Sequence, residues 1–383
     1  MCPGQALLLV VSPTCQEAGV IPSQVIPERE RLISTPDMHH GISYISRSFR
    51  FIDPINIQRH NECYLHPLFF NMNSHAVGYV PEWFDHFRVT GLIRNGMVRL
   101  YDFLIFSSLL LCFECIAMAY ISCVLQDLPW HPMLAVIPFF VAFSIYNLNR
   151  KTDEDEDVVN RQDRFAFTKR YEAPLYFGAI LFLLLALVLS ALSGIPAFFT
   201  TSAPFILGIL YSFRLLPEGF GYQRLKEIPA VKNITVGLAW GILLSLLPVF
   251  FLQRQPDMGT AVTFLLFFMW GFMASMIPDI RDRDGDARAG VRTIPVIFGE
   301  RRTKRILTGV LVLLGIPAIT ISLFHLPLSS TMIVVAANIY SHGCVVLLDK
   351  EGLIHFLADF ISDGQYIFFA SAVVIFSFLH FGY

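Results

Sequence analysis

Long runs of hydrophobic residues, separated by short polar stretches, fill the chain from about residue 99 to its C-terminus. Most of these runs approach the roughly 20 residues that a helix needs to cross the hydrocarbon core of a bilayer. Because lipid cannot satisfy backbone polar groups, the runs predict helices rather than strands. We expect an all-α integral membrane protein with nine spans, near residues 101–124, 132–149, 172–192, 195–213, 230–252, 260–279, 304–324, 328–348 and 365–382.

The first 95 residues have a different pattern, with scattered prolines, histidines and polar clusters and no hydrophobic run long enough to span. The run at Ala6–Ser12 is too short for a membrane helix and has no basic flank before it, so we do not interpret it as a secretory signal. We interpret residues 1–95 as a poorly ordered N-terminal extension without an assigned role, and residues 96–383 as the membrane domain.

Composition supports a membrane environment. Of the 383 residues, 55% are hydrophobic and only 15% are charged, whereas soluble domains are about a quarter charged. The expected surroundings are therefore a lipid bilayer, and no nucleic-acid partner is expected.

Lysine and arginine gather in the connections after the second, fourth and sixth spans, and those after the first, third and seventh have none. The positive-inside rule then places the N-terminus in the cytoplasm and the C-terminus outside. We expect a multi-pass protein of a prokaryotic cell membrane.

Two acidic clusters follow the second and sixth spans, both at the predicted cytoplasmic face. Residues three or four positions apart share one face of a helix. In each cluster this spacing selects an amide or carboxylate stripe and leaves other carboxylates, such as Asp155 and Asp284, off that face. The two stripes are Asn149, Asp153 and Asp157, and Asp279, Asp282 and Asp286.

Facing stripes of carboxylates repel one another unless a cation lies between them. Mg²⁺ is typically held by one or two carboxylates together with phosphate oxygens of a substrate. The stripes therefore predict a site for a metal-bridged diphosphate, with an apolar substrate tail inside the bundle. A solvated acidic loop is the simpler alternative for either stripe alone, but two stripes at one face disfavour it.

These motifs resemble those of the UbiA superfamily of membrane prenyltransferases, which carry NxxxDxxxD after the second helix and a second aspartate motif after the sixth. The run from Gly290 through Thr293 and Pro295 to Gly299 also resembles a stretch of that superfamily. The resemblance covers roughly residues 99–383. It implies nine helices around a central cavity with a cytoplasmic cap.

The resemblance also implies roles for individual residues. Two Mg²⁺ ions would be held by the six residues of the two stripes, with Asp153, Asp157, Asp282 and Asp286 as the catalytic carboxylates. The residues expected to contact substrate are Asn149, Arg164, Tyr211, Arg214 and Lys226.

The function implied is Mg²⁺-dependent transfer of a prenyl group from a polyprenyl diphosphate to a hydrophobic or aromatic acceptor. Aromatic, quinone-precursor, tetrapyrrole and lipid-glycerol acceptors all stay open. A membrane terpene cyclase would use the same aspartates. A cation or metabolite transporter is a weaker alternative, because transporter carboxylates usually lie near the midplane of the membrane.

Two further residues carry expectations. Glu114 lies deep in the first span, where a charge is costly. We expect it to face the interior, paired or protonated, with a catalytic role as an alternative. Asn233 begins a glycosylation sequon, but it falls at a cytoplasmic helix start and is given no role.

Overall fold

The computed structural model describes most of the chain after residue 101. The described residues are 96, 100, 102–152, 154, 158, 162–212, 225, 228–348, 354, 358 and 362–381. The predicted N-terminal extension lies outside these residues, and its boundary and lack of order stay predictions.

Helices account for almost all of the described chain, and no strand occurs within it. Every predicted span falls on a helix. The corresponding helices are α4 (Leu109–Leu125), α5 (Met133–Thr152), α8 (Glu172–Ser193), α9 (Ile195–Ser212), α10 (Val231–Phe251), α11 (Met258–Arg281), α14 (Glu300–His325), α15 (Leu328–Leu347) and α17 (Ser362–Phe381).

Six of these helices are long and apolar enough to cross a membrane: α5, α8, α10, α11, α14 and α15. Within the described residues α4, α9 and α17 have shorter apolar stretches. The described part of the chain is therefore all-helical, with several helices able to span a membrane, which confirms the predicted class for these residues. The full set of nine spans stays a prediction.

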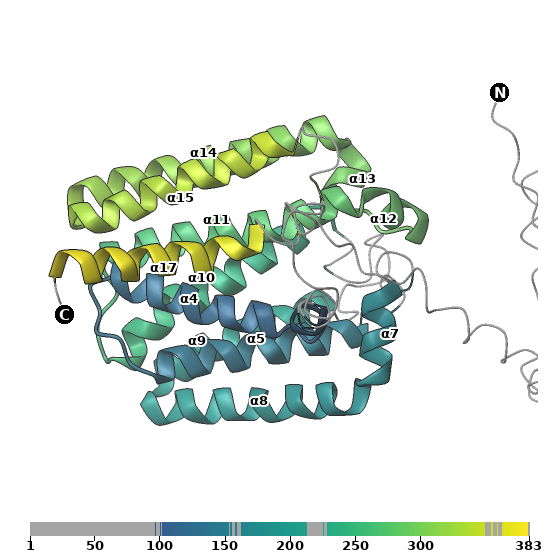
Figure 1. Ribbon diagram of the computed structural model, residues 1–383, viewed down its shortest axis with the longest axis horizontal. Helices are drawn as coiled ribbons and strands as arrows, with labels where there is room; N and C mark the ends of the chain where they lie inside the picture. Colours follow the sequence, from purple (N-terminus) through teal and green to yellow (C-terminus); the bar gives the residue numbers. More distant parts are fainter. Residues whose placement is uncertain are drawn as a thin grey trace, which may run out of the picture. The chain divides into compact units, whose positions relative to one another are not determined.

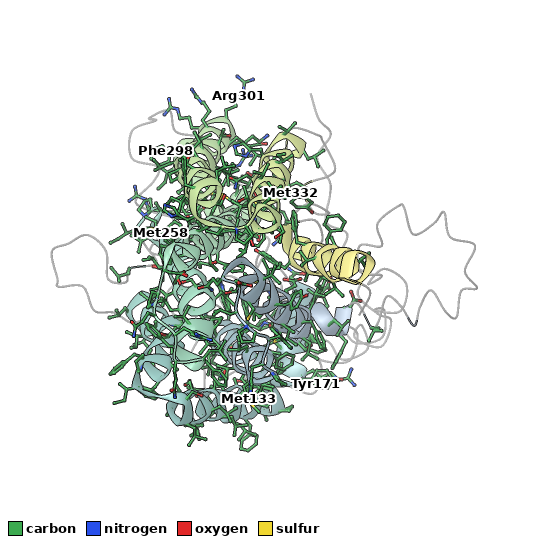
Figure 2. The ribbon with its side chains drawn as sticks, turned by 90° about the vertical axis from the view of Figure 1, so that its left-hand side faces the viewer. Met133, Tyr171, Met258, Phe298, Arg301 and Met332 are labelled. Carbon is green, nitrogen blue, oxygen red and sulfur yellow. The ribbon has the colours of Figure 1, made fainter. Side chains whose placement is uncertain are left out.

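The helices run side by side in one bundle, with α8 along one margin and α14 and α15 along the other (Figure 1). Figure 2 views the bundle along its helices, where Tyr171 lies near one margin and Arg301 at the opposite one. Within an apolar stretch of 18 residues, only 17% is buried in the outer helix α8, whereas 72% is buried in α11. Side chains such as Leu192, 80% exposed, therefore face lipid, and α11 forms the centre of the core.

Three short helices lie together at one end of the bundle (Figure 1): α7 (Gln162–Arg170), α12 (Arg283–Ala289) and α13 (Ile294–Phe298). This is also the end at which α5 and α11 finish. The segments after the second and sixth predicted spans therefore meet at one face of the bundle, as the charge pattern predicts.

Two helices are interrupted where the sequence predicts a continuous run. The first predicted span breaks at Ser107 and Ser108, because Ser108 has φ 66°, and α4 begins only at Leu109. The carbonyl oxygens freed before this break accept hydrogen bonds from α5. Arg150 donates to those of Ile105 and Phe106, and Asn147 donates to that of Ser107.

The second interruption lies in the acidic segment after α11. The helix ends at Arg281, Asp282 is the junction, and α12 starts at Arg283. The three aspartates, whose spacing predicts one shared face, are therefore distributed over α11, the junction and α12. Gly290, with φ 74°, ends α12 in the left-handed conformation that glycine adopts without strain.

Helices α10 and α11 approach one another closely through two glycines. A Cβ atom added to Gly237 would lie 2.9 Å from the carbonyl oxygen of Phe268, and one added to Gly271 would lie 3.1 Å from the Cα of Gly237. Because the two helices are antiparallel neighbours, the start of α10 lies beside the end of α11. This contact sets the position of the charged residues there.

Candidate active site

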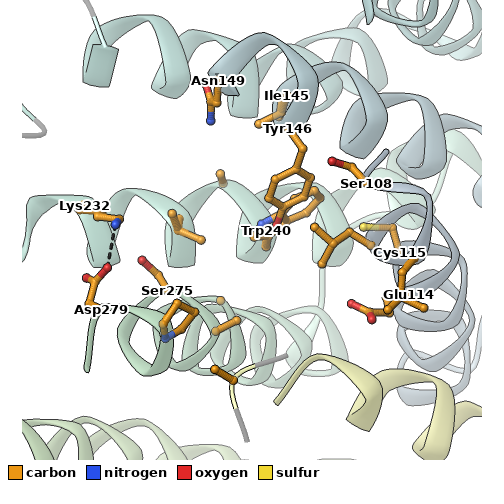
Figure 3. A pocket seen from close by; sticks show the side chains of 18 of the residues that line it. Ser108, Glu114, Cys115, Ile145, Tyr146, Asn149, Lys232, Trp240, Ser275 and Asp279 are labelled. Atoms are coloured by element: carbon orange, nitrogen blue, oxygen red, sulfur yellow. Dashed lines mark hydrogen bonds and ion pairs between the residues drawn. The ribbon is translucent and has the colours of Figure 1, made fainter. Parts of the chain in front are cut away.

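A cavity of about 390 Å³ opens within the bundle, in the size range of small-molecule sites. Its walls come mainly from two helix pairs that lie far apart in sequence, α4 with α5 and α10 with α11, and α7, α9, α12 and α17 contribute further residues. One end is charged and the walls farther in are largely apolar (Figure 3). The arrangement suits a ligand with an anionic head and a hydrophobic body.

The second acidic stripe lies at the charged end. Asp279, Asp282 and Asp286 all line the cavity although they belong to α11, the junction and α12. By contrast, the side chain of Asp284 is 79% exposed and is not part of the wall. The three carboxylates that the spacing argument selected therefore all line the cavity, and their role as metal ligands stays a prediction.

Asp279 is the most deeply buried of these carboxylates, with a side chain only 4% exposed to solvent. Lys232 of α10 forms an ion pair with it, with 2.7 Å between Nζ and Oδ1. Asn233 donates through Nδ2 to the other carboxylate oxygen at 3.2 Å and to the Ser275 hydroxyl at 3.0 Å. Both oxygens of Asp279 are thus engaged by the first turn of α10, and Figure 3 shows the contact with Lys232.

The other two carboxylates have partners close by in the sequence. Arg281 donates to both oxygens of Asp282, at 2.8 and 2.7 Å, in a bidentate pair. The Thr293 hydroxyl donates to Asp286 at 3.3 Å. The Gly290–Thr293 stretch therefore returns the chain from α12 to support the acidic segment.

From the first acidic cluster, Asn149 lies on α5 and lines the same cavity, across from Lys232 (Figure 3). Arg164 of α7 also lines it. The structure thus brings these two predicted residues together with the second stripe. Asp153, Asp157, Arg214 and Lys226 lie outside the described residues, and so does the side chain of Tyr211, whose backbone is at the end of α9.

The donor chemistry of this end fits Mg²⁺, because carboxylate and amide oxygens are hard ligands. Among the described residues no group of three His, Cys, Asp or Glu side chains is close enough to enclose a metal ion. The carboxylates instead contact Lys232 and Arg281. The set fits a magnesium ion that takes one or two carboxylates and completes its coordination with phosphate oxygens.

An aromatic pair lies between the charged end and the inner part of the cavity (Figure 3). The rings of Tyr146 and Trp240 stack with 6.1 Å between centroids and 20° between planes. Beyond them lie Glu114 and Cys115 of α4. Glu114 is 1% exposed and lines the cavity, so the expectation that it faces the interior is confirmed.

Sequence reasoning missed Lys232 and Asn233, and Asn233 had been given no role. The available signal was weak: a lysine and an asparagine at the predicted cytoplasmic start of the fifth span. Their importance depends on the register between α10 and α11, which hydrophobic periodicity does not determine.

Comparisons with known proteins agree with this geometry. The sequence model of the UbiA prenyltransferase family matches residues 109–360. The digeranylgeranylglyceryl phosphate synthase of Haloquadratum walsbyi is 30% identical over 135 residues, covering 35% of this chain and 47% of that protein. The synthase of the same name from Methanoculleus marisnigri is 28% identical over 183 residues, covering 45% and 58%. The chain thus spans about half the length of the curated relatives it matches.

Among solved structures, a UbiA homologue from Archaeoglobus fulgidus bound to GPP and Mg²⁺ superposes with a TM-score of 0.50. It is 17% identical, and the match covers 71% of this chain and 99% of the homologue. At this identity the likeness shows a shared fold. With the family model covering most of the membrane bundle, the chain belongs to the UbiA prenyltransferase family.

Proposed function

We propose that this protein is a Mg²⁺-dependent membrane prenyltransferase, which removes the diphosphate from a polyprenyl diphosphate and transfers the prenyl group to an acceptor. The observation that carries the proposal is the cavity itself: three aspartates and Asn149 surround one end of an otherwise largely apolar chamber inside a membrane bundle. Family membership and the GPP and Mg²⁺ bound by the Archaeoglobus homologue support it.

The donor diphosphate would bind at the charged end, where Lys232 and Arg164 supply positive charge. The metal ligands we propose are Asn149, Asp279, Asp282 and Asp286, together with Asp153 and Asp157. Bound Mg²⁺ would stabilise the negative charge that grows on the leaving diphosphate. We propose two ions, one for each acidic stripe.

The protein's own residues would then control the reactive prenyl group. Departure of diphosphate leaves an allylic cation, and the faces of Tyr146 and Trp240 can stabilise positive charge beside them. The apolar walls would exclude water, which would otherwise capture the cation. Holding the acceptor at attack distance would supply the remaining acceleration.

The proposed topology places all nine predicted spans in the membrane, with the N-terminus and the acidic stripes in the cytoplasm and the C-terminus outside. The grouping of α7, α12 and α13 at one end of the bundle supports a cap over that face. We retain residues 1–95 as an extension of the nine-helix domain.

The first test compares two aspartates of the same segment. Asp282→Asn removes a carboxylate that lines the cavity, and Asp284→Asn removes an exposed one outside it. With geranylgeranyl diphosphate and Mg²⁺ in detergent, Asp282→Asn should reduce diphosphate release at least about 100-fold. Asp284→Asn should release diphosphate as the unchanged protein does.

Metal removal provides a second arm of the same test. EDTA should abolish diphosphate release, and excess Mg²⁺ should restore it. Equal release by both aspartate variants, or full release in EDTA, would refute the metal-assisted reaction.

Product analysis separates the second candidate function, a terpene cyclase of the same family, which would use the same aspartates. Diphosphate release with hydrocarbon products alone would establish the cyclase. Absence of diphosphate release with donors of any chain length would favour the transporter alternative.

A further inference from the structure

The inner part of the cavity contains one acidic side chain, Glu114, that the donor site does not use. It projects from α4 and is 1% exposed to solvent, yet it lines the cavity. Figure 3 shows it on the opposite side from Lys232 and Asp279, with Tyr146 and Trp240 between them. It is therefore too remote from the charged end to belong to the aspartate stripes.

A glutamate at position 114 is energetically unfavourable inside a membrane bundle. A carboxylate in a membrane helix disfavours insertion, by up to about 2.5–3.5 kcal/mol where it lies at the helix centre. Its neighbours along the cavity wall, such as Cys115 and Met118 on the same helix, are uncharged. A leucine or methionine would pack at this site without that cost, so packing alone does not account for a glutamate.

The order of groups along the cavity indicates what Glu114 can do. The charged end would fix the diphosphate, and the aromatic pair would flank the carbon that it leaves. A nucleophile has to approach this carbon from the side away from the leaving group. Among the described residues, Glu114 is the acidic side chain that lines the cavity on the side of the aromatic pair away from the charged end.

We propose that Glu114 binds the hydroxyl group of the acceptor and takes its proton during transfer. This inference rests on the proposed prenyltransferase function and narrows its acceptor to a hydroxyl-bearing lipid. The bond from C1 of the prenyl group to the diphosphate oxygen breaks, and the acceptor oxygen forms a bond to C1 of the resulting allylic cation. The electron pair of the broken bond leaves with diphosphate, and the hydroxyl proton moves to the Glu114 carboxylate.

The names of the relatives suggest a probe for this step. Digeranylgeranylglyceryl phosphate less one geranylgeranyl group is a geranylgeranylglyceryl phosphate with a free hydroxyl. This compound, with geranylgeranyl diphosphate as donor, tests transfer to oxygen. The analogue in which hydrogen replaces that hydroxyl shows how much of the acceptor's binding to the protein depends on the hydroxyl.

The central variant is Glu114→Gln, which keeps the size and hydrogen-bonding capacity of the side chain but cannot accept the proton. Transfer to the hydroxyl acceptor should fall by about 10²–10⁴-fold, the usual contribution of a general base. Acceptor-independent release of diphosphate, with water as a slow nucleophile, should change less than about threefold. Ser122→Ala, a buried change on α4 outside the cavity wall, is the matched control and should leave both rates unchanged.

Several results would overturn the assignment. Equal transfer by Glu114→Gln and the unchanged protein would exclude the base, and equal loss of transfer and of acceptor-independent release would place Glu114 at the donor end. If Glu114→Gln does not fold, Glu114→Asp keeps the carboxylate and should retain measurable transfer; its full loss in folded protein, with transfer intact in Ser122→Ala, would count against the base. Binding of the deoxy analogue as tight as that of the hydroxyl acceptor, measured by its inhibition of transfer, would refute a role for the hydroxyl.

Failure of the broader proposal looks different from failure of this one. If the unchanged protein releases diphosphate but forms only hydrocarbons, the acceptor role of Glu114 is refuted and the donor chemistry stands. If it releases no diphosphate at all, the proposed function itself is refuted and this inference falls with it.

Discussion

Replacement of Gly237 by alanine is expected to force α10 and α11 apart. The added Cβ would lie 2.9 Å from the carbonyl oxygen of Phe268 and 3.3 Å from two carbons of its ring. Carbon–oxygen contacts in proteins start near about 3.3 Å, so the helices must separate by about 0.4 Å. The obstacle includes backbone of α11, which cannot rotate away as a side chain can.

The size of the effect follows from comparison with a glycine that has open space around it. Gly309, inside α14, has nothing within 4 Å of an added Cβ. Both changes to alanine gain up to about 1 kcal/mol of helix propensity. Only Gly237→Ala also overpacks an interface, which costs about 1–3 kcal/mol. The difference in stability between the two variants therefore isolates the helix contact.

The assay is thermal unfolding of both variants in the same detergent, with diphosphate release measured in parallel. Gly237→Ala should unfold at a temperature several degrees below that of Gly309→Ala. It should also release diphosphate more slowly, because the shift moves Lys232 away from Asp279. Identical unfolding temperatures and rates would show that the close contact of α10 and α11 does not position the charged end.

Three other changes test separate parts of the site. Lys232→Met should raise the KM for the prenyl diphosphate about 10-fold or more, because a charge-assisted contact is lost. The control is Lys169→Met, which should leave the KM unchanged because the Lys169 ammonium pairs with Glu154 outside the cavity wall. Equal KM values for the two variants would count against a contact between Lys232 and the diphosphate. Thr293→Val removes the hydroxyl that donates to Asp286 and should raise the Mg²⁺ concentration for half-maximal activity about 10-fold; an unchanged Mg²⁺ titration would contradict this. A chain that starts at Met97 should insert and retain activity, as judged in proteoliposomes, and a complete loss of activity in inserted protein would show that the extension is required.

The helices and the acidic segment could be predicted because both depend on local patterns. A run of apolar residues in lipid has to be helical, whatever it packs against. The spacing of Asp279, Asp282 and Asp286 places them on one side even across the break between α11 and α12. The family motifs likewise consist of residues close together in sequence.

Contacts between distant helices could not be predicted in the same way. The pairing of Lys232 and Asn233 with Asp279 needs the register of α10 on α11, and glycines such as Gly237 determine that register only once the partner helix is known. The break at Ser108 was also hidden, because the apolar run continues through it and the donor that compensates it, Arg150, lies more than 40 residues later.

The break before α4 has a mechanical consequence. Its carbonyl groups accept hydrogen bonds from Arg150 and Asn147 of the neighbouring helix, and that of Ile105 also accepts one from the backbone N–H of Ser108. Arg150 is 9% exposed, and separating it from these oxygens would leave a buried cation short of acceptors, at a cost of several kcal/mol. Arg150 and the preceding residue Asn149 both line the cavity, so the hydrogen bonds across this break also hold part of the cavity wall in place.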